Sequence, residues 1–140
     1  MTRTPLRCRL LHDDHGQAVV EFALVSILLF TLLFGGLDFG RALNAWAIVT
    51  QASREGARTA AAQCTVTPAC DTLVQDAVES SLVGLDVAAA RWDMDAGPYV
   101  SGSPVQVYVE YDVVPVIPLI AALIPGGILT VRGESTMRLE

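Results

Sequence analysis

The chain has 140 residues, a length that allows one domain. Hydrophobic residues make up 52% of it, and nine basic residues, all of them arginine, stand against fifteen acidic ones and leave a formal net charge of -6. This acidic balance excludes a protein that binds nucleic acid through positive charge, so no nucleic-acid partner is expected.

Residues 1–16, MTRTPLRCRLLHDDHG, form a short basic leader. The leader contains Arg3, Arg7 and Arg9, and the positive-inside rule counts arginine and largely ignores acidic residues. We therefore predict that the N-terminus lies in the cytoplasm and that the chain beyond residue 40 or so lies outside the membrane.

The stretch over residues 18–37 is mainly apolar, and Glu21 is its only charged residue. About 20 helical residues cross a hydrocarbon core about 30 Å thick, so we predict a transmembrane helix over residues 17–37. The run is too long for the apolar core of a cleaved secretory signal, and a helical pattern follows it. A soluble protein released by signal cleavage is therefore the weakest interpretation.

Glu21 is an ionisable group at a depth where an unpaired charge is costly, which indicates a functional role. Together with Gly16, Gln17 and Phe22 it gives the pattern G-x-x-x-x-E-F behind the basic leader. This pattern resembles the processing site of type IV pilin-like precursors, which a prepilin peptidase cuts after the glycine on the cytoplasmic side. Glycine suits such a cut, because an extended backbone without a Cβ fits a protease cleft.

The cut would leave an α-ammonium group on Gln17, four residues before Glu21. The two charges can pair within one helix, or between neighbouring helices where the pair sets the axial register, as pilin-like families are thought to use it. Cyclisation of the N-terminal glutamine would remove the amine and with it the pair. The alternative is that Glu21 is an interfacial carboxylate that extends to the membrane edge.

Residues 38–62 continue the helical pattern outside the membrane. Gly56 and the small residues around it let another helix approach closely, and Glu55 and Arg58 are spaced for a surface ion pair. The predicted apolar stripe packs either within the protein or against a neighbouring helix. It consists of Phe39, Leu43, Trp46, Val49, Ser53, Ala57 and Ala60.

The segments GQAVVEFALV, DFGRALNAW, ASREGARTAA and GESTMRLE are together similar to the TadE-like family, minor pilin-like components of the tight-adherence pilus secretion apparatus. The resemblance runs from Gly16 over the rest of the chain and is strongest over residues 16–62. It implies a non-enzymatic role in assembling a fibre of the major pilin, with a prepilin peptidase, other pilin-like subunits and pilus assembly proteins as partners. Family roles carry over only to Gly16, Gln17, Glu21 and Phe22.

Cys64 and Cys70 are close together in the sequence, and no histidine or further cysteine lies near them. This pattern argues against a zinc site and predicts a disulfide in a segment outside the cytoplasm, the alternative being two reduced thiols. Cys8, in the leader, is expected in the reducing compartment.

Residues 63–140 are predicted to form an extracytoplasmic α+β head. Asp71 is the expected N-cap of a second helix that ends near Gly84. Alternating residues then predict three strands in an antiparallel meander, near residues 88–95, 105–112 and 129–139. The fold class is thus α+β and pilin-like: a long N-terminal helix that spans the membrane with its first half, a short helix and a small antiparallel sheet.

The uniformly apolar segment 113–127 is too short to span a bilayer. One interpretation is that it caps the core as a short helix. The other is that it presents an apolar patch to a partner or to the outer membrane leaflet.

No G-x-S-x-G, P-loop or H-E-x-x-H pattern occurs, and His12 and His15 both lie in the leader. Asp93 and Asp95 share a strand face, but two carboxylates alone more often form a solvated face than a cation site. We expect no enzymatic activity, catalytic residue, metal or cofactor. The main hypothesis is a processed pseudopilin of the cytoplasmic membrane, and the alternative is an unprocessed single-pass anchor whose outer domain binds a ligand or partner.

Overall fold

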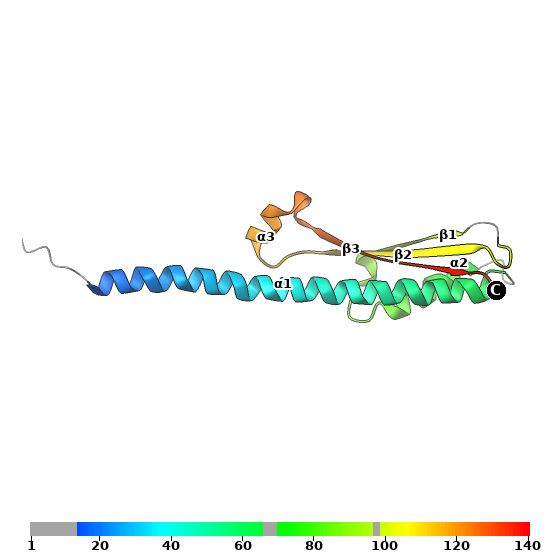
Figure 1. Ribbon diagram of the computed structural model, residues 1–140, viewed down its shortest axis with the longest axis horizontal. Helices are drawn as coiled ribbons and strands as arrows, with labels where there is room; N and C mark the ends of the chain where they lie inside the picture. Colours follow the sequence, from blue (N-terminus) through cyan, green and yellow to red (C-terminus); the bar gives the residue numbers. More distant parts are fainter. Residues whose placement is uncertain (1–13, 66–69, 97–98) are drawn as a thin grey trace, which may run out of the picture. The chain divides into compact units, whose positions relative to one another are not determined.

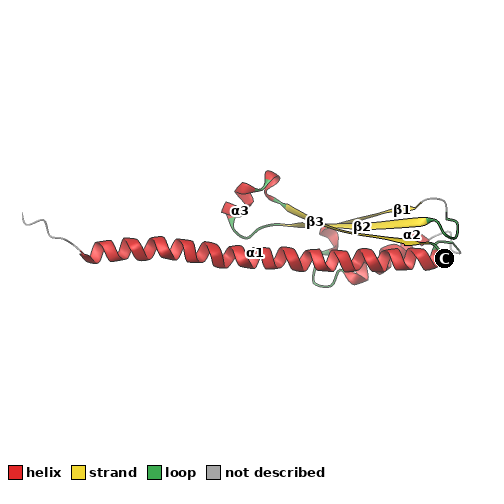
Figure 2. Ribbon diagram, in the orientation of Figure 1, coloured by secondary structure: helices red, strands yellow, loops and turns green. Residues whose placement is uncertain are grey.

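The structure is a computed structural model that describes residues 14–65, 70–96 and 99–140. Cys8 and the arginines of the leader lie outside the described residues. The elements in chain order, shown in Figure 1, are α1 (Asp14–Gln63), α2 (Cys70–Ser81), η1 (Val87–Ala89), β1 (Ala90–Ala96), β2 (Pro104–Val113), α3 (Pro118–Leu123), η2 (Pro125–Gly127) and β3 (Leu129–Arg138). A long helix, a short helix and a three-stranded antiparallel sheet confirm the α+β class (Figure 2).

The chain forms two compact units, Met1–Leu33 and Phe34–Glu140. The described part of the first unit is the N-terminal part of α1, where every large apolar side chain over residues 19–33 is more than half exposed. A helix that is apolar all round suits a lipid environment. The helix is also long and apolar enough to cross a membrane, with a mean hydropathy of 2.4 in its most apolar window, which indicates a single-pass membrane anchor.

The second unit has its own core, in which α1 contributes small side chains. Ala45, Ala52 and Ala57 are nearly or fully buried, opposite the fully buried valines of α2 and β2. A Cβ added at Gly56 would lie 2.7 Å from Val78 Cγ2 and 3.1 Å from Val107 Cγ1. The close approach that Gly56 allows is therefore made within this chain, by α2 and the sheet.

The predicted apolar stripe of α1 packs within the protein only in its second half. Phe39, Leu43 and Trp46 are 66%, 48% and 52% exposed. The buried face begins instead with Asp38 and small alanines, and it joins the predicted stripe only from residue 49 onwards. Around Thr50 and Gly56, β3 and α2 approach α1 so closely that only small side chains fit between them.

The sheet has the order β1-β2-β3 with both pairs antiparallel, which confirms the predicted meander. On β2, Val105, Val107 and Val109 are fully buried, as their alternation predicts. Gly133 of β3 pairs with Val109, and a Cβ at Gly133 would lie 2.6 Å from the Thr50 Cα and amide nitrogen of α1. Glycine is thus the residue that lets β3 lie against the helix backbone.

The segments around the sheet depart from the predictions in two details. The helix α2 begins at Cys70, so Asp71 lies in its first turn and is not the N-cap. The apolar segment 113–127 forms α3 and η2 between β2 and β3, so the short helix is confirmed. Its described side chains are half-buried or exposed, apart from the buried Val113.

Cys64 and Cys70 form the predicted disulfide, with their Cα atoms 5.0 Å apart. Cys64 follows the end of α1 and Cys70 begins α2, and both side chains are buried. The bond closes a short loop that joins the two helices.

Replacing both Cys64 and Cys70 with alanine is expected to lower the free energy of unfolding of the second unit by about 2 kcal/mol, because the open loop regains entropy in the unfolded chain. Urea unfolding of the full chain in detergent, followed by circular dichroism, measures the change. Cys8→Ala is the matched control and should leave the midpoint unchanged. An unchanged midpoint in the double variant would contradict the prediction.

Candidate functional site

The processing motif lies at the start of α1. Because the helix begins at Asp14, the bond between Gly16 and Gln17 falls in its first turn. Gly16, Gln17 and Glu21 are exposed, as is Phe22. A peptidase that takes an extended substrate has to unwind this turn, and glycine lowers the cost by about 1 kcal/mol relative to alanine.

Gln17 and Glu21 lie on the same side of α1, one helical turn apart. With Gly16, Val20 and Leu24 they line one shallow hollow. Among residues 14–65, 70–96 and 99–140, no basic side chain forms an ion pair with Glu21. An amine on Gln17 would lie within the i, i+4 distance at which opposite charges on a helix interact.

A second arrangement of polar groups is centred on Asp38, which directly follows the predicted membrane segment. Its side chain is buried, with 7% of the residue exposed. The Val116 amide donates to both carboxylate oxygens at 3.0 Å, and the Ile117 amide donates to Oδ2 at 3.1 Å. These bonds, which we call the Asp38 clasp, fix the chain between β2 and α3 to α1.

Arg41 supports the clasp from the next turn of the helix. Its Nη1 donates to Asp38 Oδ1 and to the Val114 carbonyl oxygen, both at 3.3 Å. The hydrogen bond from the Val116 amide lowers the pKa of Asp38 below its ordinary value; burial opposes this, and the Ile117 amide and Arg41 add to the lowering. The carboxylate is therefore held in its charged form.

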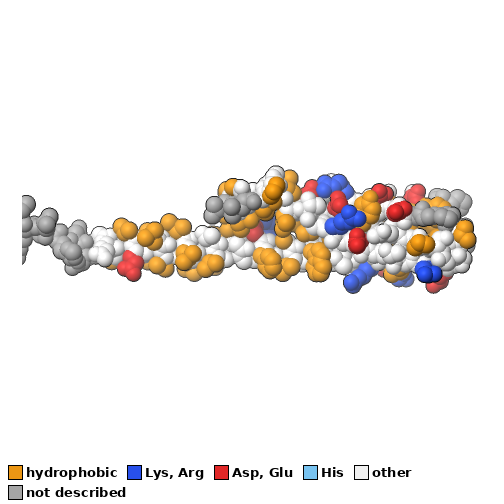
Figure 3. Space-filling model, turned by 45° about the horizontal axis from the view of Figure 1, so that its top comes forward, with side chains coloured by type: hydrophobic (Ala, Val, Ile, Leu, Met, Phe, Trp, Pro, Cys, Tyr) orange, Lys and Arg blue, Asp and Glu red, His pale blue; other side chains and the backbone are white. Residues whose placement is uncertain are grey.

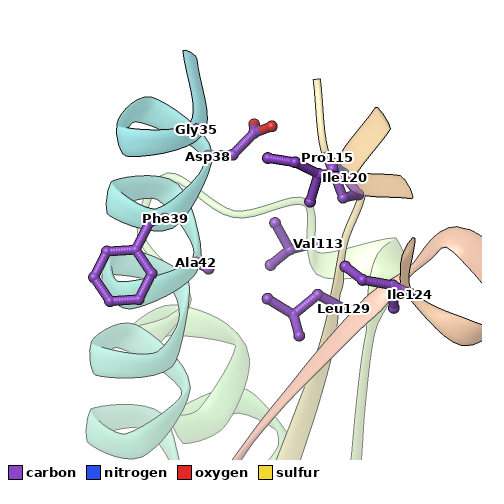
Figure 4. Close-up of a pocket in the computed structure, with 9 residues that line it drawn as sticks. All are labelled: Gly35, Asp38, Phe39, Ala42, Val113, Pro115, Ile120, Ile124 and Leu129. Atoms are coloured by element: carbon purple, nitrogen blue, oxygen red, sulfur yellow. The ribbon is translucent and has the colours of Figure 1, made fainter. Parts of the chain in front are cut away.

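An apolar cavity of about 240 Å³ lies beside the clasp. The helix α1 forms one wall, and the end of β2, α3 and the start of β3 form the other (Figure 4). Figure 4 shows Val113 and Leu129 between the walls, whereas the Phe39 ring points away from them. The lining residues are Gly35, Asp38, Phe39, Ala42, Val113, Pro115, Ile120, Ile124 and Leu129.

The cavity has one ionisable group, and both oxygens of that group accept backbone hydrogen bonds. Such a carboxylate holds the Val116 and Ile117 amides, and the chain that carries them, beside α1.

Residues 16–58 match the family model for TadE-like proteins. The resemblance predicted from the sequence is confirmed over these residues. Neither the curated proteins nor the solved structures include a significant match to the chain. The match covers 43 of the 140 residues, so it shows that this segment of the chain is similar to TadE-like proteins.

The TadE-like match includes the whole processing motif, from Gly16 to Phe22, and both Asp38 and Arg41. It ends at residue 58, before the disulfide and the sheet. The predicted site residues accordingly fall into two groups: the motif in the first turns of α1, and Cys64 with Cys70 at the far end of that helix.

Sequence reasoning missed the Asp38 clasp. Asp38 and Arg41 directly follow the apolar run in the sequence, and this position indicates only the polar boundary of the membrane segment. Their i, i+3 spacing is a signal for an ion pair, and the structure has that pair at 3.3 Å. The amides that Asp38 accepts from are 78 and 79 residues away, and no local pattern indicates them.

The outward face of the sheet carries a network of charged and polar side chains, visible in Figure 3. Arg91 donates to Asp112 at 2.8 and 3.1 Å, and the Tyr108 hydroxyl donates to Asp93 at 2.7 Å. The hydrogen bond from Arg91 lowers the pKa of Asp112, and the bond to Asp93 raises the pKa of Tyr108. Asp93 is thus held by Tyr108, and within the described residues no group of three possible metal ligands forms.

Removing the Asp38 carboxylate is expected to release the chain at residues 114–117. In the wild type, protection of the Val116 and Ile117 amides should be full above about pH 4, where an ordinary aspartate is charged. The protection should be lost as the pH falls through the lowered pKa of Asp38 in the folded protein. The pKa is lowered because the fold stabilises the charged carboxylate, and protonation removes that stabilisation. Hydrogen exchange of this peptide, corrected for intrinsic rates, measures the effect.

In Asp38→Ala the same amides should be unprotected at every pH, with no step. Asp86→Ala is the matched control, because Asp86 accepts from the Ala88 amide elsewhere in the fold. Equal protection in the wild type and in Asp38→Ala would show that the clasp does not hold the connection.

Proposed function

We propose that the chain is a non-enzymatic minor pilin-like component in the assembly of tight-adherence, type IVb pili, cut after Gly16 by a prepilin peptidase. One observation carries the proposal: the motif Gly16, Gln17, Glu21, Phe22 stands at the start of a helical segment whose large apolar side chains are more than half exposed, inside the residues that match the TadE-like family.

The same helix supports anchorage in the cytoplasmic membrane. Lipid would cover the apolar side chains of residues 19–33, which the protein itself leaves exposed. The arginines of the leader support a cytoplasmic N-terminus, with the second unit on the other side of the membrane. A disulfide between Cys64 and Cys70 agrees with an oxidising compartment.

Assembly in this proposal depends on charge pairing in lipid. An unpaired carboxylate at bilayer depth is costly, and the amine that cleavage frees on Gln17 offsets that cost. If the amine and Glu21 come from neighbouring subunits, the pair sets their axial register. Other pilin-like subunits and pilus assembly proteins are then the partners, with no nucleic acid and no cofactor involved.

Mass spectrometry of the protein from membranes of its native host tests the proposal. We expect the first residue to be Gln17, and we expect Gly16→Leu to retain the leader, because a bulky side chain does not fit where the peptidase takes glycine. Gly40→Ala is the matched control and should be cut normally, since Gly40 is open to solvent in the second unit.

The outcomes separate the two hypotheses. An intact leader in cells with an active peptidase would support the unprocessed single-pass anchor. A chain that starts at Gln17 in cyclised form would confirm the cut but contradict the charge pairing, because the amine is lost. Carbonate extraction should leave the protein in the membrane, and release would contradict the anchor itself.

A further inference from the structure

The connection between β2 and β3, residues 114–128, contains no charged and no polar side chain. In the folded unit Val114, Val116 and Ile128 remain 60%, 65% and 45% exposed. Apolar side chains gather over α3 and the adjoining turns of α1 (Figure 3). An exposed apolar cluster of this kind marks a surface that meets an apolar medium or a partner.

The structure ties this connection to the end of the predicted membrane segment. A Cβ at Gly35 would lie 3.8 Å from Ile120 Cδ1 of α3, and Gly35 is inside the predicted segment 17–37. Asp38, directly after that segment, binds the amides of Val116 and Ile117. Within the second unit, α3 and the chain before it therefore lie beside the turns of α1 around Gly35 and Asp38.

We propose that residues 114–128 rest in the outer leaflet of the membrane as a second, interfacial anchor beside the transmembrane helix. The inference rests on the proposed membrane anchorage of α1. Lipid is the occupant that the observations favour, because Ile120 lies beside Gly35, which is inside the predicted membrane segment, and Asp38 directly after that segment binds the Val116 and Ile117 amides. Exposed Val114 and Val116 would then contact acyl chains.

The backbone of the connection is suited to a medium with little water. Backbone amides without a partner are costly in lipid, and the Asp38 clasp satisfies those of Val116 and Ile117. Pro115, Pro118 and Pro125 have no amide hydrogen to satisfy.

Arg41 supplies the polar side of the same interface. Its guanidinium is half exposed, and it donates to the Val114 carbonyl from the helix turn next to the boundary. At the membrane surface, the other N–H groups of the Arg41 guanidinium can bind lipid phosphate groups, which arginine recognises well. An apolar cluster with a cation at its rim is the composition of an interfacial membrane anchor.

Fluorescence quenching by brominated lipids tests the inference on the full chain. In a Trp46→Phe, Trp92→Phe background, one tryptophan is introduced as Val116→Trp and the protein is reconstituted into phosphatidylcholine vesicles with bromines near the headgroup or near the chain ends. Ile128→Trp is a second probe of the same connection. Circular dichroism verifies that each variant is folded. We expect it to be folded, because the Val116 and Ile128 side chains are exposed.

Two further probes provide the controls. Val100→Trp replaces a valine that is also exposed, 59%, but precedes β2 and so lies at the opposite end of that strand from the connection. Leu28→Trp lies in the middle of the predicted membrane segment.

We expect Val116→Trp and Ile128→Trp to lose emission to headgroup-proximal bromines, Leu28→Trp to lose it to bromines at the chain ends, and Val100→Trp to keep it. Quenching of Leu28→Trp alone would overturn the interfacial anchor while leaving the transmembrane anchor intact, and would point to a protein partner for the apolar cluster. No quenching of Leu28→Trp would overturn the membrane anchorage itself.

Discussion

Gly133→Ala should destabilise the second unit by about 3 kcal/mol, the upper end of the usual cost of overpacking. The added Cβ would lie 2.6 Å from three backbone atoms of α1: Thr50 Cα, the Thr50 amide nitrogen and the Val49 carbonyl oxygen. Backbone atoms cannot rotate away as a flexible side chain does. Either β3 or α1 must shift, and Val109, which pairs with Gly133, is fully buried in the core that holds them together.

Thermal and urea unfolding of the full chain in detergent measure this loss. Gly40→Ala is the matched control: Gly40 also lacks a side chain, but it lies in the helix with nothing within 4 Å of an added Cβ. Alanine there should be neutral or stabilise the helix by up to about 1 kcal/mol. Equal stability of the two variants would show that β3 does not lie as close to α1 as the structure has it.

Glu21→Ala should abolish pilus formation in the native host while leaving protein level, cleavage after Gly16 and the stability of the second unit unchanged. Glu21 is exposed and is bound by no described basic residue, so its loss removes nothing from the fold. What it removes is the partner of the Gln17 amine, which would then be an unpaired charge in lipid between subunits. Electron microscopy of surface pili and immunoblots of membranes measure the two effects.

Glu21→Gln should fail in the same way, because it keeps the shape and loses the charge. Glu55→Gln should assemble normally, since Glu55 pairs with Arg58 at 2.6 Å on the surface of α1 and such pairs contribute only a few tenths of a kcal/mol. Normal pili in Glu21→Ala cells would favour the unprocessed anchor, in which Glu21 has no role.

Features set by neighbouring residues could be predicted without a structure. The apolar run of residues 18–37 indicates a membrane segment because its length and hydropathy are local properties. The alternation of Val105, Val107 and Val109 predicts β2 and its buried face for the same reason. The disulfide could be predicted from the sequence because Cys64 and Cys70 are only six residues apart.

The covered face of α1 is a property of the tertiary structure. Hydropathy favours Phe39, Leu43 and Trp46, yet the fold buries Ala42 and Ala45, because the segments that return along α1 cover the face that carries these alanines. The role of Gly133 depends in the same way on a helix backbone more than 80 residues earlier in the chain.

Asp38 shows the same division most clearly. Its place after an apolar run and its spacing to Arg41 are visible in the sequence, and they indicate a polar boundary with an ion pair. Its burial and its bonds to the amides of Val116 and Ile117 follow only once β2 and α3 return along the helix. Local patterns thus determine which segments form and which of them enter lipid, whereas contacts between distant segments decide which side chains are buried and which carboxylate holds the fold together.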